Sequence, residues 1–172
     1  AVARLVRDRL APAERRACEF HGLDLTAEML AVAARHAGLY ASLRRWSVAD
    51  TPWPVAESFF DLAACNGVLV YVAPDRAVLA EFARVVKPGG HAVLMLRDDN
   101  VAAWQPHVDR LERDRAWRLV EVSDPRDNFP GSSSSSASDD DDDVPITYRM
   151  YVFQILERAA AAASSRGGST SS

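Results

Sequence analysis

Residues 79–96 read LAEFARVVKPGGHAVLML, and this stretch decides the fold class. Its first half places apolar side chains on one face of a helix. Its second half, residues 91–96, is a nearly continuous apolar run, which is typical of a strand buried on both faces of a sheet. The segment Lys87-Pro88-Gly89-Gly90 predicts a turn between them, because proline fixes φ at the second position and glycine supplies a positive φ at the third. A helix that leads into a doubly buried strand indicates an α/β protein with a parallel sheet.

The same alternation continues on both sides of this stretch. Residues 60–65 form a second apolar run, and Thr26 is a suitable N-cap for a helix that stops at Gly38. The last two strands have no helix between them, so they should form an antiparallel hairpin at the edge of the sheet. In chain order we expect helices at 1–10, 26–37, 75–86 and 101–116, and strands at 18–23, 43–48, 60–65, 91–96, 117–122 and 146–156.

The composition indicates a folded protein without a polyanionic partner. Of the 172 residues 48% are hydrophobic, which is enough for a core, and no apolar run approaches the about 18 residues of a membrane span. The chain has 20 Lys and Arg against 24 Asp and Glu, and five of these acids form the block Asp139–Asp143. The arginines near residues 110–118 alternate with acids, so no basic face is expected. We therefore expect neither nucleic acid nor a membrane as a partner.

The organisation of the chain suggests one domain, at residues 1–156, and that domain is incomplete. A Ser/Asp-rich disordered loop is expected at 131–143 and a disordered tail at 157–172. The chain begins with Ala1 rather than Met and shows no leader peptide, which favours a piece of a longer cytoplasmic protein. Cys18 and Cys65 lie in apolar stretches and are expected to be buried reduced thiols. The four histidines have no metal-ligand spacing, so no metal site is expected.

Short polar groups follow the expected strands, at the edge where parallel sheets bind ligands. Asp24 follows the first expected strand, and a carboxylate at that position of a dinucleotide-binding unit accepts hydrogen bonds from ribose hydroxyls. A glycine-rich turn should precede it by about 20 residues, but the sequence has no glycine before Gly22. The other rim residues are Ser47, Val48 and Asp50 after the second strand, Asn66 after the third, and Arg97 and Asp98 after the fourth.

Three motifs in order resemble class I S-adenosylmethionine-dependent methyltransferases. The segment GLDLTAEML at 22–30 resembles their GxDxSxxML segment, and FDL at 60–62 is similar to the entry of their fourth strand. The segment LAEFARVVKPGG at 79–90 is similar to their LxExxRVLKPGG before the fifth strand. The resemblance covers about residues 1–156. Within the class, Gly38-Leu39-Tyr40 and the stretch around Trp53 most resemble the methyltransferase-like 27 (Williams–Beuren region) group.

This resemblance implies a Rossmann-like sheet in the order 3-2-1-4-5-7-6, with an antiparallel terminal hairpin. The central first strand and the glycine-rich loop would be missing from this chain. We therefore expect a gap or an improvised pairing between the strands at 17–23 and 60–66. We also expect the chain as it stands to bind S-adenosylmethionine poorly or not at all.

The resemblance also implies roles for the rim residues. Asp24 would bind the ribose of S-adenosylmethionine, with Leu25 beside it. Ser47, Val48 and Asp50 would lie at the adenine position, although the family's acidic residue there is replaced by serine. Asn66 would orient the methyl acceptor, a small molecule or a protein, or the methionine amine. No residue is expected to act as a chemical catalyst, because a sulfonium is already a good leaving group and alignment supplies most of the rate.

Two other functions remain open from the sequence. One is a non-catalytic interaction module, a methyltransferase fold that no longer binds its cofactor. The other is an NAD(P)-dependent oxidoreductase, which would also place an acid after its second strand. The KPGG segment, the terminal hairpin and the absence of a Tyr-x-x-x-Lys pair disfavour the oxidoreductase.

Overall fold

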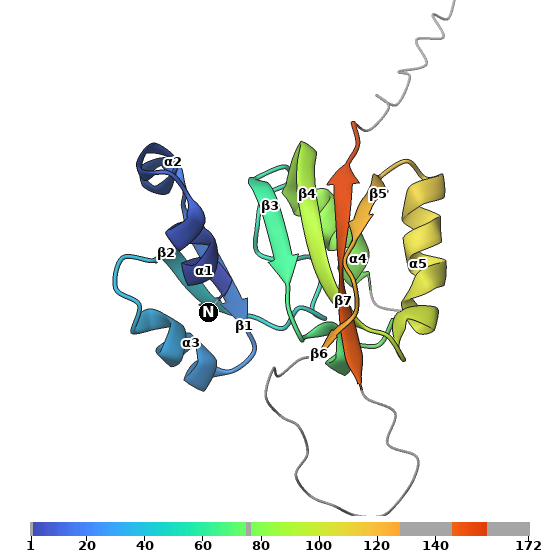
Figure 1. Ribbon diagram of the computed structural model, residues 1–172, viewed down its shortest axis with the longest axis horizontal. Helices are drawn as coiled ribbons and strands as arrows, with labels where there is room; N and C mark the ends of the chain where they lie inside the picture. The colour runs from blue at the N-terminus through green and yellow to red at the C-terminus, as the bar shows by residue number, and fades with distance from the viewer. Residues whose placement is uncertain (1, 75–76, 128–145, 158–172) are drawn as a thin grey trace, which may run out of the picture. The chain divides into compact units, whose positions relative to one another are not determined.

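The computed structural model describes residues 2–74, 77–127 and 146–157 (Figure 1). The chain divides into two compact units, Ala1–Pro54 and Val55–Ser172, and each is described by itself. The first unit holds a two-stranded sheet of β1 and β2. The second holds a five-stranded sheet in which β3, β4, β7 and β5 follow one another and β6 pairs with β7. An α/β protein is therefore confirmed.

The first unit is a βαβ arrangement preceded by two helices. Strands β1 and β2 are parallel, and α3 connects them. Pro12, which follows the helix predicted at 1–10, begins a second helix, and this suits proline because the first helical N–H has no partner within the helix. The elements are α1 (Val2–Arg9), α2 (Pro12–Ala17), β1 (Phe20–Asp24), α3 (Ala27–Ala34) and β2 (Tyr40–Arg45).

The second unit contains the predicted terminal hairpin. Strand β7 lies antiparallel between β4 and β5, and β3 lies parallel to β4. Helix α5 continues through Pro106, which only removes a donor to the Ala102 carbonyl. The elements are β3 (Phe60–Cys65), η1 (Leu69–Tyr71), α4 (Val78–Val85), β4 (Val86–Arg97), α5 (Val101–Arg113), β5 (Trp117–Val122), β6 (Arg126–Asp127) and β7 (Thr147–Ile155).

The strand neighbours within each sheet follow the predicted sequence of strands. In the first unit β1 pairs with β2, which corresponds to the 3-2 part of the predicted order 3-2-1-4-5-7-6. In the second unit β3, β4, β7 and β5 follow one another, which corresponds to its 4-5-7-6 part. The order across the two units stays a prediction.

The prediction that residues 60–65 are buried on both faces is wrong. Asp61, Leu62 and Ala64 of β3 are exposed. Strand β3 is an edge strand of its sheet, so neighbouring side chains do not surround it. Strand β4 is covered fully on one face only, since Ala92, Leu94 and Leu96 are buried and the residues between them are half-buried.

The KPGG segment was predicted as a turn before the strand. In the structure its residues form the beginning of β4. Gly89 takes the predicted positive φ, at 82°. The pairing of β3 with β4 shifts register here, between Phe60 and Leu62. Gly90 lies so close to β3 that a Cβ atom would come within 2.5 Å of the Asp61 carbonyl oxygen. The second glycine is therefore required by close packing of two strands.

The core of the second unit lies between its sheet and helices α4 and α5. Trp104 of α5 and Trp117 of β5 are buried, and the Trp117 ring stacks on Phe153 of β7 with ring centroids 4.2 Å apart. No helix in the described residues combines the length and apolar character that crossing a membrane would need.

The two cysteines differ in their surroundings. Both are free thiols. Cys65 is buried at the end of β3, and burial raises the pKa of its thiol to about 11. Cys18 is exposed, so its predicted burial is wrong. It directly follows α2, a helix that buries none of its residues, so no core forms around it.

Helix α5 ends in a Schellman motif that carries an arginine where glycine is favoured. The Arg115 N–H donates to the Glu112 carbonyl at 3.0 Å, and the Ala116 N–H donates to the Leu111 carbonyl at 2.9 Å. Arg115 has φ 55°, in the left-handed region. We expect Arg115→Gly to raise the free energy of unfolding by about 1 kcal/mol, because glycine has no Cβ to strain there. Chemical denaturation measures this, with Arg113→Gly, inside the helix, expected to destabilise instead.

Candidate functional site

The carboxyl ends of β1 and β2 bring the predicted nucleoside-binding residues to one edge. Asp24 ends β1 and is in register with Arg45, which ends β2. The Trp46 N–H donates to the Asp24 carbonyl at 3.0 Å, and Arg45 Nε donates to the Leu25 carbonyl at 3.0 Å. The loop that follows β2 therefore begins directly beside Asp24. Asp24, Leu25, Ser47, Val48 and Asp50 share this edge of the first unit.

The Asp24 side chain is held by the helix that follows it. Its Oδ1 accepts hydrogen bonds from the Thr26 N–H and the Thr26 hydroxyl, both at 2.8 Å. Thr26 in turn accepts from the Met29 N–H at 3.4 Å, which confirms it as the N-cap of α3. Asp24 Oδ2 has no hydrogen-bond partner among the described residues. Local contacts thus fix the carboxylate and leave one oxygen available to a ligand.

The loop after β2 is a closed turn held by the indole N–H groups of Trp53 and Trp46, and the latter donates to the Asp50 carbonyl at 2.7 Å. The Asp50 N–H donates to the Ser47 carbonyl at 3.0 Å, and the Ala49 N–H donates to Ser47 Oγ at 3.2 Å. The Trp53 indole N–H donates to the Val48 carbonyl at 2.9 Å. Trp53 is buried, so it supports this loop from within. These contacts replace the last part of the strand predicted at 43–48.

The remaining groups at this edge are exposed. The Leu25 side chain is 60% exposed, which leaves an apolar surface next to Asp24. Asp50 is exposed, and its carboxylate makes no hydrogen bond among the described residues. This edge therefore combines a carboxylate oxygen, an apolar side chain and a polar loop. Such a combination of groups suits a nucleoside.

In the second unit, Asn66 and Arg97 stand at the carboxyl ends of β3 and β4. Asn66 is exposed and is followed by Gly67, whose φ is 71°. Arg97 binds Asp99 through Nε and Nη2. This paired hydrogen bonding raises the pKa of Arg97 and lowers the pKa of Asp99. The charge of Arg97 is therefore largely balanced by the neighbouring Asp99 carboxylate.

Asp98 belongs to a network that sequence reasoning missed. It accepts hydrogen bonds from the Thr147 hydroxyl and from Arg149 Nε, the latter at 3.0 Å. Its N–H donates to the Thr147 carbonyl at 3.0 Å. The sequence analysis predicted Asp98 only as a polar group at the rim of the sheet. Its partners come from β7, about 50 residues later in the chain, and no local sequence pattern predicts them.

The described residues include the predicted nucleoside-binding groups, but they include no glycine-rich turn before β1. The residues described before β1 contain no glycine, and they form helices α1 and α2. They offer no backbone turn for close approach to a methionine moiety. Among the described residues there is also no group of three His, Cys, Asp or Glu side chains that could hold a metal ion. The Asp139–Asp143 block lies outside the described residues.

Comparisons with known proteins give one consistent family. The family model described as "Methyltransferase domain" matches residues 7–94. Ubiquinone biosynthesis O-methyltransferase of Cronobacter sakazakii is 34% identical over 86 residues, which cover 48% of this chain and 35% of that protein. The protein of the same name from Pectobacterium carotovorum is 32% identical over 97 residues, covering 55% of this chain and 40% of that protein. The matched segments thus span well under half the length of these relatives.

Solved structures share the fold at low identity. A methyltransferase in complex with the Haloferax volcanii Trm112 methyltransferase activator has a TM-score of 0.63 at 20% identity, covering 91% of this chain and 78% of that one. Geranyl diphosphate methyltransferase in complex with SAM has a TM-score of 0.57 at 16% identity, covering 90% and 84%. These likenesses concern the fold.

Proposed function

The chain belongs to the methyltransferase-domain family, and from this premise we propose that it takes part in methyl transfer from S-adenosylmethionine to an acceptor. The observation that supports this most is the fixed carboxylate of Asp24 at the carboxyl end of β1, with Oδ2 available. A nucleoside presents two neighbouring ribose hydroxyls, and a carboxylate oxygen accepts from such donors.

We propose a role for each group at this edge. Asp24 Oδ2 accepts from the ribose, Leu25 packs against the adenosine, and the loop Ser47, Val48 and Asp50 binds the adenine side. S-Adenosylmethionine supplies an electrophilic methyl group on a sulfonium, so the protein needs mainly to align the acceptor. Asn66, exposed at the end of β3, is the residue we propose for orienting the acceptor or the methionine amine.

The domain boundaries, the methyl acceptor, the finer family group and the cellular compartment are also proposals. Residues 1–156 would form one methyltransferase-like domain, and the acceptor would be a small molecule or a protein. The finer resemblance to the methyltransferase-like 27 group rests on Gly38-Leu39-Tyr40 and the stretch around Trp53. The two free thiols agree with a reducing compartment such as the cytoplasm.

A second candidate function is a non-catalytic interaction module. It is favoured by the absence of a glycine-rich turn from the residues described before β1. A module of this kind would keep the fold and lose cofactor binding. The oxidoreductase alternative gains no support, because the family match is to methyltransferases.

The test is Asp24→Asn in a longer version of the chain, with a β-strand and a glycine-rich turn added before Ala1. Asparagine keeps an oxygen for Thr26 and replaces the available Oδ2 by an NH₂ group, which cannot accept a hydrogen bond. We expect affinity for S-adenosylhomocysteine, measured by calorimetry, to fall about 10- to 100-fold, the range for hydrogen bonds to a charged group.

The control is Glu28→Gln, an exposed acid in the first turn of α3. It changes the charge near Asp24 and should leave the affinity within about twofold, since exposed charges interact weakly. Unchanged binding in Asp24→Asn would remove Asp24 from the cofactor site. Absence of binding in every version would favour the interaction module.

A further inference from the structure

Trp104 Nε1 is the one buried side-chain nitrogen or oxygen that has no hydrogen-bond partner among the residues that the structure describes. Trp104 belongs to α5 and is 0% exposed. A buried N–H that donates to nothing loses the hydrogen bond that it makes with water in the unfolded chain, and this loss destabilises the folded state. Buried polar groups of native proteins are therefore nearly always bonded to protein or to an ordered water. Trp104 Nε1 needs an acceptor that the described side chains do not supply.

A cavity of about 50 Å³ lies beside Trp104, between α5 and the sheet of the second unit. Its apolar lining comes from the helix and from three strands: Val101 and Val108 of α5, Leu96 of β4, Leu119 of β5 and Phe153 of β7. The volume is well below the roughly 300–1,000 Å³ of small-molecule pockets. A water molecule, in contrast, needs only about 10–15 Å³ of space. The cavity therefore has room for water but not for an organic cofactor.

Three further polar side chains line this cavity and can accept hydrogen bonds, namely those of Gln105, Glu112 and Tyr151. Glu112 Oε1 accepts from the Leu119 N–H at 3.0 Å, and Gln105 Nε2 donates to Asp109 Oδ1 at 2.7 Å. Glu112 Oε2, Gln105 Oε1 and the Tyr151 hydroxyl make no hydrogen bond among the described residues. A buried water requires two to four polar partners. The lining thus offers a donor for such a water and acceptors for its own hydrogens.

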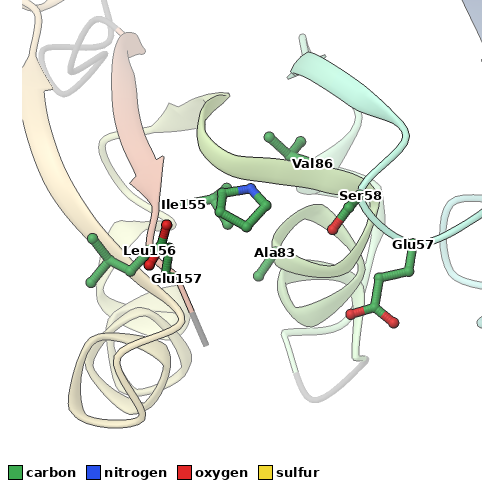
Figure 2. Close-up of a pocket in the computed structure, with 8 residues that line it drawn as sticks. Glu57, Ser58, Ala83, Val86, Ile155, Leu156 and Glu157 are labelled. Carbon is green, nitrogen blue, oxygen red and sulfur yellow. The ribbon is translucent and has the colours of Figure 1, made fainter. Parts of the chain in front are cut away.

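The larger cavity of the second unit lacks a buried donor of this kind. It measures about 320 Å³, and Ala83, Val86 and Ile155 form its buried apolar part (Figure 2). The side chains of Glu57 and Glu157, which also line it, are exposed. In the described part of the chain, no buried polar side-chain atom of its lining is without a partner. The need for a bound acceptor therefore exists at the smaller cavity.

We propose that the cavity between α5 and the sheet is a water-binding site, in which a bound water accepts a hydrogen bond from Trp104 Nε1. The same water donates its hydrogens to the side-chain oxygens that line the cavity. Because Trp104 belongs to α5 and Tyr151 to β7, the water contributes to holding this helix against the sheet. The site is additional to methyl transfer and does not depend on that function.

The test uses NOESY and ROESY spectra of the 172-residue chain, in which cross-peaks between water and the indole N–H signals are compared. A water that stays in a buried site gives cross-peaks of opposite sign in the two spectra, whereas a rapidly exchanging surface water gives the same sign. We expect opposite signs at the Trp104 indole N–H and no cross-peak at that of Trp117. Trp117 is the matched control, because it is also buried and donates to the Val108 carbonyl at 3.4 Å.

Tyr151→Phe excludes a false signal, because it removes the one hydroxyl of the cavity lining, whose proton exchanges with water and can relay magnetisation to Trp104. The Trp104 cross-peak should persist in this variant, since the oxygens of Gln105 and Glu112 remain. A missing Trp104 cross-peak, equal signs in the two spectra, or loss of the cross-peak in Tyr151→Phe would overturn the proposal. An equally strong cross-peak at Trp117 would also overturn it, because water would then not be specific to this cavity.

Discussion

S-Adenosylhomocysteine titrated into the 172-residue chain should show no saturable binding at micromolar concentrations. We propose Asp24 and its neighbours as the nucleoside-binding residues, but the residues described before β1 offer no glycine-rich turn for the methionine part. Ligand groups bound in one preformed site share a single cost of immobilisation, so losing the contacts to half of the ligand lowers affinity steeply.

The longer version of the chain, with the added strand and glycine-rich turn, should bind at least 100-fold more tightly. Calorimetry on both versions under identical conditions measures the difference. Circular dichroism of both serves as the folding control. Micromolar saturable binding by the 172-residue chain itself would show that the first unit suffices for the cofactor, and this prediction would be wrong.

Trp117→Ala should lower the free energy of unfolding of the second unit by about 3–5 kcal/mol, the usual range for removal of a buried tryptophan. Trp117 is 1% exposed and stacks on Phe153. Its indole N–H reaches the Val108 carbonyl of α5 at 3.4 Å. The side chain therefore links β5, β7 and α5, and its removal leaves a cavity between sheet and helix.

Urea denaturation followed by circular dichroism measures this loss. Val120→Ala is the control, because Val120 belongs to the same strand and is exposed. It should cost less than about 1 kcal/mol, as surface substitutions usually do. A similar loss in both variants would mean that the hydrophobic face of β5 is not where the structure places it.

The parts of the fold that local patterns control were predictable from the sequence. Thr26, a threonine directly before a helical segment, predicts an N-cap, and the structure has it. The long apolar run of β7 and the absence of a helix before it predict the terminal hairpin, which is present. Neighbour relations within each sheet followed from three short motifs in order.

The parts that depend on distant contacts were not predictable. The apolar run of β3 indicated burial on both faces, but its exposure depends on how many strands surround it. Asp98 has partners in β7 that no spacing reveals. Local sequence does not reveal that Trp53 supports the loop after β2, which its hydrogen bond to the Val48 carbonyl shows. Helix α2 was missed because Pro12 fits both the end of one helix and the start of the next.

The positions of the candidate site residues were predictable where these residues directly follow the end of a strand. Asp24 is placed at the end of β1, and the loop containing Ser47 and Asp50 follows β2 beside it. Which carboxylate oxygen is available could not be read from the sequence, because it depends on the bonds that Thr26 makes. Those bonds make the expectation specific to Asp24 Oδ2.

A crystal structure of the longer version of the chain with S-adenosylhomocysteine bound would show directly whether Asp24 binds the ribose. A ribose hydroxyl is expected within hydrogen-bond distance of Asp24 Oδ2, with Oδ1 still bound to Thr26. The adenine should lie beside Leu25 and the loop after β2. Nucleoside density at any other place, or an Asp24 carboxylate that makes no contact with the ribose, would show that Asp24 does not bind the cofactor.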